Sequence, residues 1–216
     1  MSSRFAVSLP LEIGFTRRVL VAAEIVDGVT LRPVTTGIKV TATGLRRRPV
    51  VNFSGFYVWL EEGGREAQEI VVDAEGTEYQ SARASPLLPP DHARIQLPPA
   101  YGYRFPPGAT ALRGTLRASL YGSPDPIGGA LVRLQWSGDS GWIDAPLASR
   151  SAASGDFAVP LRLASTAEPR LLANGSLAVR LRVERDGVSR TSDEIPLRQG
   201  SVSVLSAPFI WDDLAP

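Results

Sequence analysis

The sequence contains no cysteine, a single histidine and a single lysine. The absence of cysteine excludes disulfide bonds, thiolate metal ligands and a cysteine nucleophile. With His92 as the only imidazole, a cluster of histidine ligands is excluded and one candidate remains for a Ser-His-Asp arrangement. No phosphate-binding loop or dinucleotide fingerprint is present. We therefore expect no cofactor and no metal site.

Long apolar runs are also missing. The first ten residues lack an apolar run of signal-peptide length, and no stretch approaches the length of a membrane-spanning helix. The net charge is +1, so bulk charge gives no drive toward nucleic acid or an anionic membrane. We expect a protein that is cytoplasmic when synthesised, binds no nucleic acid and does not insert into membranes. Later release or injection as part of a particle is compatible with these features.

Glycine and proline are abundant, with 20 and 18 residues, and they leave little room for long helices. Between them, segments of alternating or continuous apolar residues recur at short intervals, which predicts β-strands. Residues 176–184 show the clearest alternation of apolar and charged side chains. The other expected strands cover residues 18–26, 37–43, 56–60, 70–72, 92–97, 110–120, 130–136 and 156–163. This pattern is typical of an all-β protein built from antiparallel sandwiches.

Proline clusters near the middle of the chain indicate a division into two parts. Residues 85–93 hold three prolines and residues 97–108 hold four. Because proline fixes φ and lacks an amide donor, these stretches fit stiff, extended connectors rather than central strands. The predicted units are an N-terminal sandwich, a Pro-rich connector, a C-terminal sandwich and an apolar C-terminal arm, over residues 1–97, 98–108, 109–200 and 201–216.

The two halves of the chain share one arrangement. Each has a strand, a polar turn with proline, a strand that follows a glycine, a variable loop and a strand that begins with Ser-Gly. The matched segments are residues 21–34, 37–42 and 54–60 in the first half, and residues 112–127, 129–134 and 154–161 in the second. Two copies of one pattern predict two domains of one architecture.

A family resemblance rests on the turns of this repeat. The segment Asp27-Gly-Val-Thr-Leu-Arg-Pro-Val34 resembles the opening hairpin of carboxypeptidase-regulatory-like domains, and Ser54-Gly-Phe-Tyr57 and Ser154-Gly-Asp-Phe157 resemble a later strand of that family. The family's Thr-Gly pair is absent, and the second copy has Gly122-Ser-Pro-Asp-Pro126 at that place. The resemblance implies two tandem immunoglobulin/transthyretin-like β-sandwiches with a non-catalytic accessory, scaffolding or binding role.

Candidates for catalysis are few. His92 follows Pro-Pro-Asp with no nucleophile signature nearby, and it fits a solvated loop. Acidic residues that are adjacent in sequence point apart on a strand and do not form the facing pair that glycoside hydrolysis needs. The acidic residues around Gly76 depart from the spacing of a calcium loop and fit a hairpin turn. We therefore predict that the protein is not an enzyme.

The candidates for interaction are basic and aromatic side chains: Arg46, Arg47, Arg48, Tyr57, Trp59 and Trp142. The basic run fits either a solvated turn or a contact with an acidic partner or nucleic acid. The two aromatic residues at 57 and 59 share one face of a strand, which is either packed in a core or open to a sugar or a partner. Trp142 follows a loop rich in glycine and serine and is a candidate contact residue.

The C-terminal segment is too apolar for an idle tail. It carries Phe209, Ile210, Trp211 and Leu214. These side chains either fold back on their own domain or dock on a neighbouring subunit.

Together these features predict a non-enzymatic structural or interaction subunit whose partners are other protein subunits of a larger assembly. By fold analogy, we infer an assembly of the phage-tail-like or contractile injection type. The alternative is a β-sandwich module that binds a carbohydrate or another cell-surface ligand through the aromatic strand or Trp142.

Overall fold

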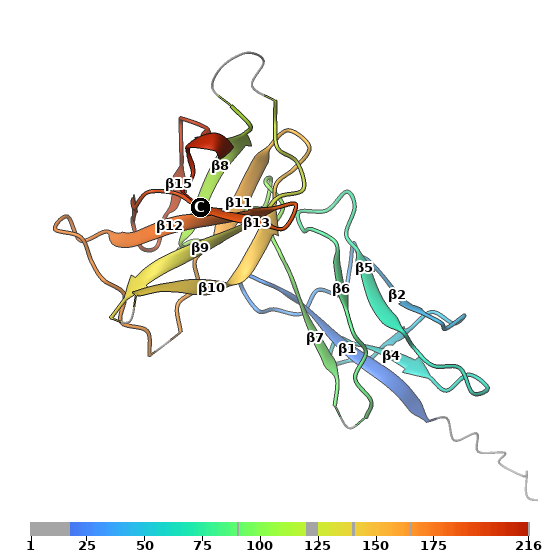
Figure 1. The fold of residues 1–216 in the computed structure, drawn as a ribbon. Helices are drawn as coiled ribbons and strands as arrows, with labels where there is room; N and C mark the ends of the chain where they lie inside the picture. Colours follow the sequence, from blue (N-terminus) through green and yellow to red (C-terminus); the bar gives the residue numbers. More distant parts are fainter. Residues whose placement is uncertain (1–17, 90, 120–124, 140, 165, 216) are drawn as a thin grey trace, which may run out of the picture.

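The computed structural model describes residues 18–89, 91–119, 125–139, 141–164 and 166–215. Two segments of the sequence analysis lie outside this range. They are residues 1–10, which were searched for a signal peptide, and residues 122–124 of the Gly122–Pro126 turn. The described chain is all-β and forms two β-sandwiches (Figure 1). Within it, no helix is long and apolar enough to cross a membrane.

The first sandwich, formed by the strands up to Leu97, has two sheets. The strands of one sheet are β1 (Val19–Asp27), β3 (Val50–Val51), β4 (Phe56–Leu60) and β7 (Ala93–Leu97), in the order β3-β4-β1-β7. The strands of the other are β2 (Lys39–Thr43), β5 (Glu69–Asp73) and β6 (Ala82–Ala84), in the order β2-β5-β6. Alternate side chains face the space between the sheets, as with Ile70 and Val72 on β5, because successive residues of a strand point to opposite faces.

The second sandwich also has two sheets. The larger sheet contains β9 (Leu131–Gly138), β10 (Gly141–Arg150), β12 (Leu177–Arg185) and β13 (Val188–Thr191), in the order β10-β9-β12-β13, and β14 (Ile195–Leu197) also pairs with β12. The smaller sheet contains β8 (Ala111–Arg117), β11 (Asp156–Pro160) and β15 (Val202–Val204), in the order β11-β8-β15, and β16 (Phe209–Ile210) also pairs with β8. A 3-10 turn, Trp211–Asp213, follows β16.

The apolar core of the second sandwich follows the alternation read from the sequence. Leu177, Val179, Leu181 and Val183 of β12 are all buried in one cluster with side chains of the smaller sheet. Phe157 of β11 is the largest fully buried side chain in that cluster. Each sandwich thus has an apolar core of its own.

The internal repeat has a structural counterpart. In the first sandwich β1 pairs antiparallel with β4 and parallel with β7, and in the second β8 pairs antiparallel with β11 and parallel with β15. Gly55 and Gly155, from the matched Ser-Gly turns, have φ angles of +84° and +83°. Glycine adopts this region without steric cost. A Cβ atom on Gly155 would also lie 2.3 Å from the carbonyl oxygen of Leu116, so the turn requires glycine there.

One strand of the shared arrangement lies in different sheets in the two sandwiches. In the second, β10 pairs with β9 along its length and extends the larger sheet. In the first, β3 follows β2 in the chain but pairs with β4 of the opposite sheet. As a result, β2 is an edge strand among the described residues, whereas its counterpart β9 is an interior strand.

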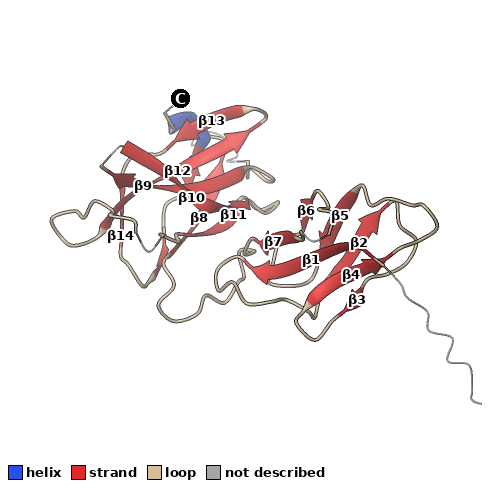
Figure 2. Cartoon of the chain, turned by 90° about the horizontal axis from the view of Figure 1, so that it is seen from below, coloured by secondary structure: helices blue, strands red, loops and turns tan. Residues whose placement is uncertain are grey.

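Residues 98–108 join β7 to β8 between the two sandwiches (Figure 2). They contain two turns, closed by hydrogen bonds from the amide of Tyr103 to the carbonyl of Ala100 at 3.0 Å and from the amide of Ala109 to the carbonyl of Pro106 at 3.1 Å. The segment is not free, because Tyr79 and Pro99 form an antiparallel bridge and the amide of Gln80 donates to the carbonyl of Pro98 at 2.8 Å. The connector is therefore attached to the first sandwich before the chain enters β8.

Candidate functional site

The most elaborate polar arrangement of the described chain lies where the two sandwiches meet. At its centre is Asp27, the last residue of β1, which is buried. Its Oδ1 accepts hydrogen bonds from the amides of Val29 at 2.7 Å and Thr30 at 3.2 Å. Its Oδ2 accepts from the hydroxyl groups of Tyr103 at 2.7 Å and Tyr79 at 3.4 Å. Such a set of donors compensates a buried carboxylate for the water it has lost.

The two tyrosines are held in their neutral form by this environment. Burial, together with the negative charge of Asp27, raises the pKa of Tyr79 to about 12. Burial and the hydrogen bond to Asp27 raise the pKa of Tyr103 further above its ordinary value. Both hydroxyl groups therefore remain protonated donors at neutral pH, which is what the carboxylate of Asp27 requires.

Arg113 of β8 extends the arrangement into the second sandwich. Its guanidinium donates to the carbonyl oxygen of Tyr103 and lies 5.3 Å from the ring centre of Phe105 and 5.7 Å from that of Tyr101. A cation over aromatic faces gains from the ring quadrupoles when it is partly removed from water. The aromatic residues of the connector are thereby fixed to the second sandwich as well as to the first.

Two further contacts join the sandwiches without the connector. The side-chain amide of Gln80 donates to the carbonyl of Arg150 at 2.7 Å, and the amide of Arg150 donates to Oε1 of Gln80 at 2.7 Å. Arg162 donates to the carbonyl oxygen of Gly28 at 3.1 Å and to Oε1 of Gln96 at 3.3 Å. The two donor–acceptor pairs at Gln80 fix its orientation on the backbone of β10, in the way a neighbouring strand would.

Close packing completes the junction at Gly28. A Cβ atom at this position would lie 2.7 Å from Cδ2 of Leu147 and 2.7 Å from the carbonyl oxygen of Leu97. Leu147 belongs to the second sandwich and Leu97 to the first, so the backbone of Gly28 is wedged between them. Glycine is needed here for close approach, since its φ is not in the left-handed region.

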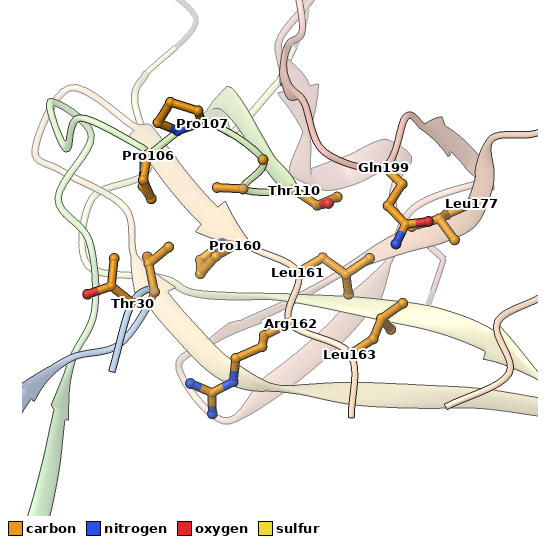
Figure 3. Close-up of a pocket in the computed structure, with 13 residues that line it drawn as sticks. Thr30, Pro106, Pro107, Thr110, Pro160, Leu161, Arg162, Leu163, Leu177 and Gln199 are labelled. Carbon is orange, nitrogen blue, oxygen red and sulfur yellow. The ribbon is translucent and has the colours of Figure 1, made fainter. Parts of the chain in front are cut away.

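A cleft of about 370 Å³ opens beside these contacts (Figure 3). Thr30 of the first sandwich, Pro106 and Pro107 of the connector, and Pro160 and Leu161 of the second line it. Arg162 also lines the cleft, but its guanidinium is already engaged with the first sandwich. Leu163, Leu177 and Gln199 of the second sandwich also line the cleft.

Elsewhere the lowered carboxyl pKa values also belong to structural turns. The hydroxyl groups of Ser154 and Thr115 donate to Asp156 at 2.7 and 2.8 Å and hold the pKa of that carboxyl below its usual range. Over the part of the chain that the structure describes, no group of three or more His, Cys, Asp or Glu side chains could hold a metal ion. His92 is exposed, with its ring 4.9 Å from that of Phe56.

The basic run at Arg46, Arg47 and Arg48 forms an exposed turn. The amides of Arg46 and Arg47 donate to the carboxylate of Glu62 at 3.0 and 2.6 Å, which lowers the pKa of Glu62. The run is thus held through its backbone, and Nε of Arg47 also lies 3.8 Å from Oε1 of Glu62. This geometry explains the turn and leaves the contact with an acidic partner a prediction.

Tyr57 and Trp59 lie in the core of the first sandwich, with exposures of 4% and 1%. The hydroxyl group of Tyr57 donates to the carbonyl of Val34 at 3.3 Å, and burial raises the pKa of Tyr57. Neither ring is open to a sugar or a partner at the surface. Of the two alternatives for this aromatic face, the structure has the packed core, so the expectation of binding through it is corrected.

Trp142 lies near the start of β10 and is half-buried. The guanidinium of Arg180 sits 4.6 Å from the centre of its ring, and Nε of Arg180 donates to Oε1 of Gln135 at 2.6 Å. One face of the indole ring is therefore occupied by the protein's own arginine. A role of Trp142 as a contact residue stays a prediction.

The C-terminal segment folds back on the second sandwich. Phe209 of β16 lies 6.0 Å, ring to ring, from Phe157, and Ile210 and Leu214 are buried. The guanidinium of Arg190 lies 4.8 Å from the centre of the Trp211 ring. The segment thus adopts the first of its two alternatives, because its apolar side chains complete a core within the same chain.

Sequence reasoning located the Asp27-Gly28 turn and the Pro-rich connector but missed that the two meet in one site. The partners Gln80, Arg113 and Arg162 carry no local pattern that separates them from other polar residues of strands and loops. One signal was present in the connector, where Tyr101, Tyr103 and Phe105 alternate. Aromatic side chains at this density rarely stay in water, so a docked connector could have been predicted.

Comparisons with known proteins find only distant similarity, and only to solved structures. No protein-family model matches it, and neither does any curated protein. Among solved structures, a streptococcal ancillary pilin overlaps 85% of this chain with 10% identity and a TM-score of 0.25, and the chain spans 60% of the pilin's length. The shaft pilin SpaA of Lactobacillus rhamnosus GG overlaps 88% of this chain, over 96% of its own length, with 10% identity and a TM-score of 0.27. Likeness at this level carries no argument about function, and no family is assigned.

Proposed function

We propose that this protein is a non-enzymatic structural subunit of a larger protein assembly, in which its two sandwiches act as one stiff element. The observation that carries the proposal is the junction. A buried carboxylate with four donors, an arginine stacked on connector aromatics and a side-chain amide docked on a strand all fix the angle between the sandwiches. A module that binds its ligand through one domain does not require a fixed angle between two domains.

The specific context we propose is a phage-tail-like or contractile injection particle. A chain without cysteine needs no oxidising compartment and fits synthesis and folding in a reducing cytoplasm, before a particle is released. Genes for sheath, tube or baseplate proteins next to the gene for this chain would support the context. Genes for an unrelated pathway in that position would contradict it.

A carbohydrate- or surface-binding module remains the second candidate function, supported by Trp142 alone. The ring is half-buried with Arg180 on one face, which leaves the other as the surface for stacking on a sugar. Binding of the isolated chain to a glycan array, lost in Trp142→Ala, would favour this candidate. Absence of binding would leave the structural role as the account of the protein.

The structural role is tested by loosening the junction. The double variant Arg113→Met, Arg162→Met removes the stacked guanidinium and the two hydrogen bonds to the first sandwich. Each sandwich keeps its own core, so we expect both to stay folded while small-angle scattering shows a wider range of interdomain angles. Native purification should show wild-type chain in a particle far larger than 23.1 kDa, and the variant at a reduced level.

The matched control is Arg94→Met. Nε of Arg94 forms an ion pair with Glu24 at 3.1 Å, and both residues belong to the first sandwich. We expect incorporation of this variant at the wild-type level. Equal incorporation of the junction variant, with its loosened angle verified, would contradict a role that depends on stiffness.

A further inference from the structure

The first sandwich has an open sheet edge at a position that the second fills. β9 lies between β12 and β10, whereas β2 has β5 on one side and, among the described residues, no strand on the other (Figure 1). The residues of β2 reflect this, because Lys39, Thr41 and Thr43 are exposed and Val40 and Ala42 are buried. An edge of this kind presents unpaired backbone groups that another strand can use.

The space beside this edge is a groove of about 270 Å³. Ile38, Lys39, Val40 and Thr41 line it together with Arg48 and Pro49. The next residues of the chain, Val50 and Val51 of β3, are both exposed, with 58% and 44% of their surface open. Two exposed valines thus follow directly on the residues that line the groove.

The second sandwich shows what belongs in such a position. There β10 places Ala145, Leu147 and Ser149 in buried positions, and Ala145 is part of the core. In the first sandwich no described strand beside β2 supplies a matching row, because β3 has moved to the opposite sheet. The first sandwich therefore lacks one strand of side chains that its sister has.

A segment with the pattern of that strand precedes β1 in the sequence. Every odd position from 5 to 15 is apolar: Phe5, Val7, Leu9, Leu11, Ile13 and Phe15. The even positions carry Ala6, Ser8, Pro10, Glu12 and Gly14. Strict alternation over this length is the pattern of a strand with one buried and one exposed face.

Pro10 further restricts where this strand can lie. Proline has no amide donor, so within sheets it is confined to edge strands with its nitrogen turned away from the neighbour. Backbone groups of even and odd residues point to opposite sides of a strand. With Pro10 turned outward, the odd residues form the ladder to one neighbour only. A strand added beside β2 meets this condition, and Glu12 on its exposed face would complement Lys39 and Arg48.

We propose that residues 5–15 of one copy add as a β-strand to the open edge of β2 in a second copy of this chain. The inference rests on the proposed function, since it names the contact that links subunits. Because donor and acceptor surfaces differ, the interface is head-to-tail, and repeated addition builds a row of subunits rather than a closed pair.

The chain's own edge is a strained target for this segment. Residues 16–18 separate the segment from β1, so the four Cα steps from residue 15 to residue 19 span at most about 14 Å. The step to the other sheet takes about 10 Å of that length. The sideways step must also pass a neighbouring strand, because β1 is an interior strand with β4 and β7 beside it. A link this short favours a neighbouring copy as the donor.

The first experiment measures mass by light scattering at increasing concentration of the full chain. We expect oligomers that grow with concentration, and a monomer when residues 1–15 are deleted or when Leu9→Arg and Leu11→Arg are combined. Ser8→Arg, on the exposed face of the same segment, is the matched control and should assemble as the wild type does. Assembly that survives the deletion or the double variant would overturn strand addition.

The second experiment uses the absence of cysteine, which makes any disulfide report a designed contact. Chains with Ser8→Cys, Ala6→Cys or Glu12→Cys are mixed under mild oxidation with chains that carry Thr41→Cys. We expect a cross-linked dimer for at least one register, and no dimer when the acceptor is Arg83→Cys on β6, at the opposite edge of the same sheet.

The outcomes separate this inference from the proposed function. A third chain carries a donor cysteine and Thr41→Cys together, and it tests pairing within one chain. A cross-link within this chain at nanomolar concentration, or no cross-link between separate chains in any register, would overturn strand addition between copies. Neither result touches incorporation into a native particle, which is the test of the proposed function. If the chain enters a particle equally well without residues 1–15, the proposed function stands and the strand-addition contact is ruled out.

Discussion

The two sandwiches share one arrangement of strands, and one strand of that arrangement lies in a different sheet in each. In the second, the strand after β9 stays in the same sheet, covers its edge and adds to the core. In the first, the strand after β2 crosses to the opposite sheet as the short β3, and the β2 edge stays open. In the first repeat the sheet therefore ends at β2, whereas in the second the counterpart β9 is covered and the sheet ends at β10. The comparison teaches that the same strand can add to the core in one copy of a repeat and leave a sheet edge accessible in the other.

The largest expected effect comes from two buried aromatic side chains, one on β11 and one on β4. Phe157→Ala should lower the free energy of unfolding of the second sandwich by about 3–5 kcal/mol, because it leaves a cavity in a closed core. Trp59→Phe in the first sandwich should cost far less, since the buried Nε1 of Trp59 has no hydrogen-bond partner among the described residues. Thermal unfolding of each variant measures both values. Equal losses of unfolding free energy for the two variants would contradict this expected difference.

The second effect concerns the junction. Tyr103→Phe removes the shorter of the two tyrosine hydrogen bonds to the carboxylate of Asp27. We expect a loss of about 1.5–3 kcal/mol, typical of a hydrogen bond to a charged group, in the unfolding of the first sandwich. The second sandwich should unfold as before, because Asp27 belongs to β1. Chemical denaturation followed by tryptophan fluorescence measures both transitions, and an unchanged first transition would show that the buried carboxylate is compensated elsewhere.

Alkaline pH should act on the first sandwich before the second. Tyr79 ionises in the unfolded chain near pH 10 and in the folded chain near pH 12, so the folded state holds its proton longer. The stabilisation is complete below pH 10 and is lost as the pH rises through about 12. Tyr79→Phe should remove the part of the alkaline loss of stability that is due to this residue. Unfolding curves recorded between pH 9 and 12, together with the absorbance of tyrosinate, measure it. A wild-type curve in the variant would contradict the assignment.

The smallest effect is expected from exposed ion pairs on the two outer faces. Arg83→Ala breaks a single pair with Glu69 at 3.2 Å in the first sandwich and should cost about 0.2–1 kcal/mol. Arg182→Ala in the second sandwich removes contacts with Asp144 and Glu184 together and should lie at the upper end of that range. Both losses should shrink in high salt. A larger loss for Arg83→Ala than for Arg182→Ala would reverse the comparison.

The all-β fold could be predicted from the sequence wherever strands alternate strictly, as β12 does at Leu177 and Val179. It could not be predicted at β10, because Pro146 interrupts the pattern there. In the structure the register of β10 shifts between Asp144 and Ala148, which is how an edge strand accommodates proline. The sheet that β3 joins was equally hidden, since two consecutive valines fit either sheet.

The junction was hidden for a different reason. Asp27 and Tyr103 meet across 76 residues, and local pattern shows only a turn at one and a connector at the other. The Asp27-Gly28 turn was recognised as turn chemistry, but the wedge of Gly28 against Leu147 depends on how two domains are placed. Contacts of this kind follow from tertiary structure and leave no periodicity in the sequence.

The parallel pairing of β1 with β7 has a mechanical consequence. The two strands are joined over five residue pairs, from Ala23 opposite Ala93 to Asp27 opposite Leu97. The chain enters at the start of β1 and leaves at the end of β7, so tension between these points pulls the strands along their lengths in opposite directions. All five pairs then share the load at once, instead of parting one after another. A subunit linked at its N-terminus and through its connector would resist stretching in its strongest direction.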